Sequence, residues 1–254
     1  MDASTRPVRF PGASGRLLAA KTDLPAGTPR AFAIFAHCFT CSKDFFTAAR
    51  VSRRLADRGI GVLRLDFTGL GASEGDRPYG AFDDSVADVL SAAEYLRERY
   101  EAPALLVGHS FGGATVLAAA GLLPEVRAVA TIAAPSTPAQ VRDLFGAAAE
   151  QIERDGEGTV ELAGRRFVFG REFLASIAGQ PSRHRVAELG AALLVLHAPG
   201  DTLVDVSHAA AIFRAARHPK SYVSLDTADH YLSDVGDAHY AADLIAVWAE
   251  HYLS

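Results

Sequence analysis

The chain has 254 residues, of which 49% are hydrophobic and 22% charged, and its formal net charge is −5. This composition supports one large α/β domain or two small ones with a substantial core, and it argues against disorder. No basic face or arm indicates nucleic-acid binding. The N-terminus lacks the apolar core of a signal peptide and no apolar run is long enough to span a bilayer, so no membrane partner is expected. Two cysteines make no disulfide framework, and we expect a cytoplasmic protein.

Apolar runs alternate with helical patterns along the chain, which is typical of a mostly parallel sheet covered by helices. After an opening hairpin over 8–20, the predicted strands span 31–36, 61–66, 104–107, 128–132, 192–197 and 221–225. The predicted helices span 42–58, 83–100, 114–120 and 237–252, and a glycine-rich loop spans 67–80. The expected fold class is therefore α/β.

Residues 108–113 read Gly-His-Ser-Phe-Gly-Gly and stand between a predicted strand and a predicted helix. A Gly-x-Ser-x-Gly pentapeptide in that context is typical of a nucleophile elbow. The turn is so tight that a side chain at Gly108 or Gly112 would collide with backbone. The following helix directs its N-terminal N–H groups and its dipole at any anion formed there. We therefore predict that Ser110 is a nucleophile, and the alternative is a plain glycine-rich turn.

A serine hydroxyl needs a base to accept its proton and a third group to orient that base. His230 is the best candidate base, because it lies between the last predicted strand and the final helix, at the sheet edge expected to hold Ser110. The alternative is a surface loop histidine. Asp201 is the predicted acid, since it follows a predicted strand in a Pro-Gly-Asp turn. Asp205 is the second choice. Asp229 is disfavoured, because neighbouring side chains in an extended loop usually point apart.

Two donors are needed to stabilise the negative charge that develops on an attacked carbonyl oxygen. One is predicted to be the backbone N–H of Phe111, directly after the nucleophile. The other is predicted to be the N–H of Phe39, in the loop that follows the strand at 31–36.

The stretch between the predicted strands at 128–132 and 192–197 is far longer than a single crossover helix requires. Its patterns indicate a helix over 138–153, a hairpin over 158–169 and another short helix over 171–177. We interpret residues 135–185 as a small cap inserted over the site, with 1–134 and 186–254 as the core. The alternative is an ordinary decorated crossover.

Four phenylalanines of this inserted segment are candidates for a substrate pocket that also includes Cys38. They are Phe145, Phe167, Phe169 and Phe173. The alternative is that they only hold the cap to the core, and the sequence does not separate these two roles.

Four segments together resemble the α/β-hydrolase superfamily, over essentially the whole chain. They are His-Cys-Phe-Thr-Cys-Ser-Lys-Asp at 37–44, Asp-Phe-Thr-Gly-Leu-Gly-Ala-Ser-Glu-Gly at 66–75, the elbow at 108–113, and Ala-Asp-His at 228–230. Within the superfamily the chain is similar to feruloyl and cinnamoyl esterases. It resembles more closely the hydrolase half of bacterial proteins that fuse a hydrolase to an OsmC-type domain.

This resemblance implies an α/β-hydrolase fold and a serine esterase whose partner is a small-molecule ester. It implies Ser110, Asp201 and His230 as the triad and Phe39 with Phe111 as oxyanion donors. It also implies hydrolysis of carboxylic esters without a metal or an organic cofactor.

Cys38 and Cys41 stand where those esterases have glycines. Cys38 narrows the room beside the predicted oxyanion hole, which predicts a small or differently oriented acyl group. The Cys-x-x-Cys spacing also suggests a redox or metal-binding role. A thioredoxin-like pattern around the pair is missing, so we favour the alternative of small buried side chains.

Several alternatives stay open at this point. The same triad is compatible with peptides, thioesters or carbon–carbon bonds as substrates. A non-catalytic binding protein on this fold is disfavoured, because all three triad residues are present. The sequence also leaves a homodimer open.

Overall fold

The computed structural model describes residues 3–75, 80–162, 164–180 and 182–253. The predicted glycine-rich loop over 67–80 and the predicted hairpin over 158–169 therefore lie partly outside the described residues.

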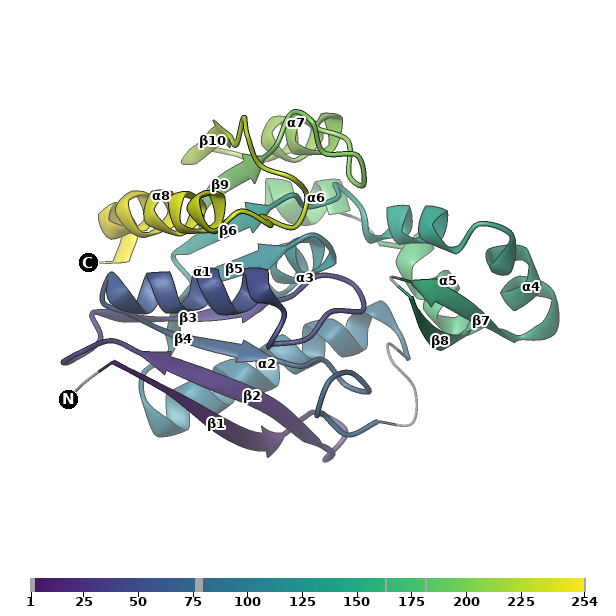
Figure 1. Cartoon of the computed structure of the whole chain (residues 1–254), viewed down its shortest axis with the longest axis horizontal. Coiled ribbons are helices and arrows are strands. Elements are labelled where there is room, and N and C mark those ends of the chain that lie inside the picture. Colours follow the sequence, from purple (N-terminus) through teal and green to yellow (C-terminus); the bar gives the residue numbers. More distant parts are fainter. Residues whose placement is uncertain (1–2, 76–79, 163, 181, 254) are drawn as a thin grey trace.

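Within the described residues, one large sheet has the strand order β1-β2-β4-β3-β5-β6-β9-β10 (Figure 1). The strands are β1 (Ser4–Pro11), β2 (Leu17–Leu24), β3 (Ala31–Ala36), β4 (Ile60–Leu65), β5 (Pro103–His109), β6 (Ala128–Ile132), β9 (Ala192–His197) and β10 (Lys220–Ser224). β2 pairs antiparallel with β1 and β4, and the remaining neighbours pair in parallel. Every residue of β3, β4, β6 and β9 is buried, as expected for parallel strands covered on both faces. The predicted mostly parallel sheet is confirmed.

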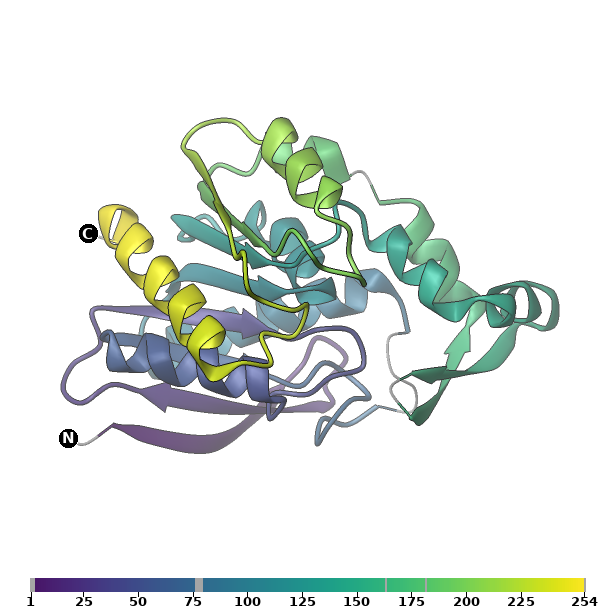
Figure 2. The same cartoon turned by 45° about the horizontal axis from the view of Figure 1, so that its top comes forward.

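Helices cover both faces of the sheet (Figures 1 and 2). They are α1 (Phe46–Asp57), α2 (Phe82–Arg99), α3 (Phe111–Ala120), α6 (Ser182–Ala187), α7 (Ser207–Ala215) and α8 (Val235–Leu253). On β3, Ile34 belongs to the apolar cluster that includes α2 and α3, whereas Phe35 belongs to the cluster that includes α1 and α8. Successive side chains of a strand face opposite sides, so one continuous apolar run contributes to both cores.

The chain between β6 and β9 projects beyond one end of the sheet (Figure 2). It contains the 3₁₀ helix η1 (Pro138–Phe145), α4 (Ala147–Asp155), β7 (Glu157–Leu162), β8 (Arg165–Gly170) and α5 (Arg171–Ala178). β7 and β8 form the predicted antiparallel hairpin. We refer to η1 through α5 as the inserted segment.

Two predicted helices differ from those observed. The single helix predicted over 138–153 is wrong, because Gly146, with φ of +50°, separates η1 from α4. The helix predicted over 42–58 begins only at Phe46, because turns occupy the residues before it. α6 and α7 were not predicted as elements of their own.

Candidate active site

Ser110 lies in the turn between β5 and α3, with φ of 54° and ψ of −123°. Residues with a side chain rarely adopt this conformation. A Cβ on Gly108 would lie 2.3 Å from the carbonyl oxygen of Gly112, and a Cβ on Gly112 would lie 2.2 Å from that of Ala36. Both positions therefore require glycine. The second contact also shows that the end of β3 packs directly against the start of α3.

Ser110, His230 and Asp201 form one hydrogen-bonded chain. The Nε2 atom of His230 lies 3.1 Å from the Oγ atom of Ser110, and its Nδ1 atom lies 2.7 Å from Oδ2 of Asp201. Ser110 is 9% exposed, and His230 and Asp201 are each 7% exposed. The three residues follow β5, β10 and β9, so the parallel sheet brings their distant positions to one edge. The structure thus brings together the three predicted residues.

The backbone of the next turn orients the carboxylate of Asp201. Its Oδ1 atom accepts hydrogen bonds from the N–H groups of Leu203 and Val204, each at 2.9 Å. Burial opposes ionisation of this carboxyl, but the hydrogen bonds from His230 and from the two N–H groups outweigh it and lower the pKa of Asp201. An ionised Asp201 therefore turns its Oδ2 atom toward the imidazole.

The other acidic candidates have different partners. Asp205 accepts a hydrogen bond of 2.8 Å from the N–H of Ser207, and Asp229 accepts one of 2.8 Å from the N–H of Ser233. Both are exposed, and it is Asp201 that contacts Nδ1 of His230. The geometry therefore favours the first choice for the acid over the second.

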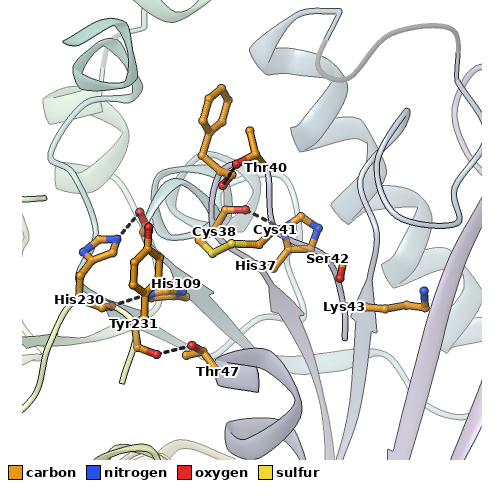
Figure 3. Close-up of a disulfide and its surroundings, with 12 residues drawn as sticks. His37, Cys38, Thr40, Cys41, Ser42, Lys43, Thr47, His109, His230 and Tyr231 are labelled. Atoms are coloured by element: carbon orange, nitrogen blue, oxygen red, sulfur yellow. Dashed lines mark hydrogen bonds between the residues drawn. A yellow bond between two sulfur atoms is a disulfide. The ribbon is translucent and has the colours of Figure 1, made fainter. Parts of the chain in front are cut away.

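Side chains from β5 and α1 hold the backbone of the loop that carries His230 (Figure 3). Nε2 of His109 donates to the carbonyl oxygen of His230 at 2.7 Å. The hydroxyl of Thr47 donates to the carbonyl oxygen of Tyr231, and Arg50 donates to that of Ser233 at 2.8 Å. Three carbonyls of one short loop are thus fixed from two elements.

Neither His109 nor Thr47 was predicted from the sequence to support the site, although His109 is part of the elbow motif itself. Burial, reinforced by the nearby His230, lowers the pKa of His109 to about 3. The ring is therefore neutral, with one N–H, and the hydrogen bond to a carbonyl requires that proton on Nε2. No spacing rule links His109 to a loop that follows the last strand.

Cys38 and Cys41 form a disulfide in the loop between β3 and α1 (Figure 3). The interpretation of the pair as small buried side chains is therefore wrong, because the two cysteines are bonded to each other and Cys41 is only partly buried. Lys43, shortly after the disulfide, is tied to the sheet, because its backbone N–H and its ammonium group each contact Asp66 at 2.6 Å. Asp66 follows β4 and is fully buried. The loop thus has a covalent closure and a buried ion pair within a few residues.

A cavity of about 310 Å³ opens beside Ser110 and His230. Its lining combines the predicted oxyanion loop with the inserted segment, and the residues are Cys38, Phe39, Thr40, Ser110, Phe111, Pro135, Gln140, Val141, Asp143, Leu144, Leu162, Leu203, Val204, His230 and Tyr231. Cys38, one of the residues predicted for the pocket, is in this lining, and Phe39 and Phe111, the predicted oxyanion donors, line the same cavity. Most of the lining is apolar.

The four phenylalanines predicted for the pocket are not among its lining residues. Phe145, Phe167, Phe169 and Phe173 are buried, and three of their rings lie 5.5 to 6.0 Å from the ring of Phe39. Phe39 also contacts the ring of Phe111 at 5.2 Å. The prediction that these four residues line the pocket is therefore wrong. They form an aromatic core that joins the inserted segment to the rest of the fold, which was the alternative. Aliphatic side chains such as Leu144 and Leu162 line the cavity instead.

Among the residues that the structure describes, no group of three or more His, Cys, Asp or Glu side chains is arranged to hold a metal ion. None of the helices in the described ranges is both long and apolar enough to cross a membrane.

Residues 33–251 match the model of the Alpha/beta hydrolase family, so the chain belongs to that family. Its fold, with a mostly parallel sheet between layers of helices, agrees with this assignment. None of the curated proteins compared with it matches the chain.

Solved structures resemble the chain over almost its whole length. The esterase domain of a Rhodothermus marinus protein is 43% identical, with a TM-score of 0.81, and the match covers 99% of this chain and 100% of that one. Est1E from Butyrivibrio proteoclasticus, solved with ferulic acid, is 19% identical with a TM-score of 0.83, covering 97% and 99%. A serine hydrolase without a lid from Xanthomonas campestris is 21% identical with a TM-score of 0.67, covering 98% and 96%. The last two support the fold alone.

Proposed function

We propose that this protein is a serine hydrolase that cleaves carboxylic esters through an acyl-enzyme. The observation that carries the proposal is the hydrogen-bonded chain from Ser110 through His230 to Asp201 at the wall of an apolar cavity. Similarity to the esterase domain of the Rhodothermus marinus protein supports the choice of esters as substrates.

In the first half of the reaction, Oγ of Ser110 attacks the ester carbonyl carbon while Nε2 of His230 accepts the hydroxyl proton. The 3.1 Å separation suits this transfer. The charged imidazolium is stabilised by Asp201, whose carboxylate lies 2.7 Å from Nδ1. His230 then donates its proton to the leaving alcohol, and the acyl group remains on Ser110.

In the second half, a water molecule loses a proton to His230 and attacks the acyl carbon. Collapse of the second tetrahedral intermediate releases the acid and returns the proton to Ser110. The backbone N–H groups of Phe39 and Phe111 stabilise the oxyanion in both halves. The contact between Gly112 and the end of β3 supports this pairing, because it keeps the two loops close together.

The cavity suggests the substrate class. Its volume of about 310 Å³ is near the lower end for ligand pockets, and its wall is mostly apolar. Esters with a short or medium-length apolar group are therefore the proposed substrates. Cys38 at the wall supports the expectation of a small acyl group.

The test compares the wild type with Ser110→Ala on p-nitrophenyl acetate, butyrate and palmitate. We expect the wild type to cleave the two shorter esters faster than palmitate and to be labelled by a fluorophosphonate, and we expect the variant to do neither. Cleavage that survives in Ser110→Ala would refute the mechanism. Amide and thioester substrates assayed beside the esters distinguish the alternative leaving groups.

A further inference from the structure

The Cys38–Cys41 disulfide closes a single turn that contains Phe39 and Thr40. The Cα atoms of the two cysteines are 5.4 Å apart, and the N–H of Cys41 donates to the carbonyl oxygen of Cys38 at 3.2 Å. This is a four-residue β-turn with Phe39 and Thr40 as its central residues. The turn therefore sets the direction of the Phe39 backbone at the wall of the cavity.

Thr40 has φ of +59°, in the left-handed region. A β-branched residue rarely adopts this conformation, which persists only where the surroundings enforce it. Glycine or asparagine is the usual residue at the third position of a turn with positive φ. Threonine thus occupies the position of this turn where a residue that tolerates positive φ is favoured, and the disulfide spans this position.

Hydrogen bonds hold the first peptide group of the turn and the chain that follows it. The carbonyl oxygen of Cys38 accepts from Nδ1 of His37 at 2.7 Å and from the N–H of Cys41 at 3.2 Å. After it, Lys43 is bound to Asp66 through its backbone and its side chain. Opening the disulfide would therefore leave β3 and α1 in place and remove the covalent link across the turn, so that only these hydrogen bonds would oppose relaxation of Thr40 and movement of the Phe39 N–H.

We infer that the Cys38–Cys41 disulfide is a redox-sensitive positioning element of the oxyanion hole. In the disulfide form it keeps Thr40 left-handed and the N–H of Phe39 directed at the reacting carbonyl oxygen. In the dithiol form Thr40 relaxes, the donor moves away, and turnover falls. This inference rests on the proposed function, because it assigns the oxyanion role to Phe39.

The chemical step is thiol–disulfide exchange with a dithiol reductant. Cys41 is partly exposed and Cys38 is buried, so a reductant thiolate reaches the sulfur of Cys41 first. Its attack breaks the S–S bond and forms a mixed disulfide, and Cys38 leaves as a thiolate that takes up a proton. The second reductant thiol then releases Cys41. Two electrons and two protons pass to the protein, and the reductant becomes a cyclic disulfide.

The experiment compares the oxidised enzyme with enzyme reduced by dithiothreitol, after thiol titration has accounted for both cysteines of the chain. We expect kcat for a short-chain p-nitrophenyl ester to fall about 10- to 100-fold on reduction, which is less than the 10²–10³ typical of complete loss of one oxyanion donor. KM should change by less than about threefold, since the N–H contacts mainly the tetrahedral intermediate. Affinity for a trifluoromethyl ketone, which forms a tetrahedral adduct, should fall in parallel with kcat.

Three variants act as controls. Cys38→Ser and Cys41→Ser should show the low turnover of the reduced enzyme, and dithiothreitol should not change them. Thr40→Asn tests the turn directly, because asparagine tolerates positive φ. Its ratio of oxidised to reduced kcat should be several-fold smaller than that of the wild type. An unchanged ratio in this variant would overturn the role given to Thr40.

Failure of this inference is distinguishable from failure of the proposed function. An active oxidised enzyme whose dithiol form is equally active overturns the inference alone. If no ester is cleaved, the rate of fluorophosphonate labelling of Ser110 in the two redox forms still tests the turn, since the phosphoryl oxygen of the probe occupies the same oxyanion position. Equal labelling rates would also overturn the inference.

Discussion

Replacing Asp201 by asparagine is the sharpest test of the triad, because the structure determines how the new amide would sit. Oδ1 of Asp201 accepts two backbone hydrogen bonds, from Leu203 and Val204. The amide oxygen of Asn would keep both, so its NH₂ group would face Nδ1 of His230. Two donors cannot share one hydrogen bond, so the imidazole would carry its proton on Nε2, toward Ser110. The base would then present a donor where an acceptor is needed.

The expected loss of kcat follows from the free-energy cost of turning the new amide around, so that its oxygen faces Nδ1 of His230. Turning the amide around would leave one buried and one partly buried N–H group without an acceptor, at about 1–3 kcal/mol each. The total of about 2–6 kcal/mol corresponds to a loss of between about 30-fold and about 10⁴-fold in kcat. The assay is kcat on saturating p-nitrophenyl butyrate, with thermal melting to confirm an intact fold.

Asp205→Asn is the matched control, because Asp205 is an exposed acid in the same turn region that binds the N–H of Ser207. It should keep kcat within about twofold of the wild type, as most surface substitutions have small effects. If Asp201→Asn is folded and retains more than about a third of wild-type kcat, the tautomer argument is refuted.

Two further predictions concern buried polar groups, one beside the site and one on α2. His109→Leu removes the donor to the carbonyl oxygen of His230 and should lower kcat about 10-fold with little change in KM. His109→Gln keeps an N–H donor and should recover part of the lost kcat. Equal activity of the two variants would contradict the positioning role of His109. Burial raises the pKa of Asp88 to about 6 despite its hydrogen bonds from Thr68, so the folded state holds this proton more tightly than the unfolded chain. The contribution of Asp88 to stability is present below pH 4 and is lost as the pH rises to about 6. Across that window, the free energy of unfolding of Asp88→Asn should therefore rise by up to about 3 kcal/mol relative to that of the wild type, as measured by urea unfolding at each pH. A difference in unfolding free energy that does not change with pH would refute this.

Local patterns in the sequence were enough to predict the elbow and most of the sheet. The apolar runs of β3, β5, β6 and β9 are strands that are buried on both faces, and such runs are visible without any knowledge of their neighbours. Gly108 and Gly112 are needed for contacts within one turn and with the adjacent strand end. The order of elements then predicts that the loops holding Ser110, Asp201 and His230 share one edge of the sheet.

The inserted segment was predicted less well. A helical pattern over 138–153 does not reveal that Gly146 adopts a positive φ and divides it. The sequence also left open whether Phe169 and Phe173 line the pocket or hold the cap to the core. Only the fold shows that their rings pack on Phe39, so that they form a core and are not part of the cavity wall.

The sequence by itself determined which residues carry reactive groups and which local turn presents the serine, because these depend on backbone constraints over a few neighbouring positions. The tertiary structure decided which partners those groups meet across the sheet. The turn after β9 directs the carboxylate of Asp201 toward His230, and His109 supports the loop of His230 from β5. The disulfide spans Thr40 because the turn brings two cysteines within bonding reach. Such pairings depend on distances between separate segments, and only packing of the whole chain sets those distances.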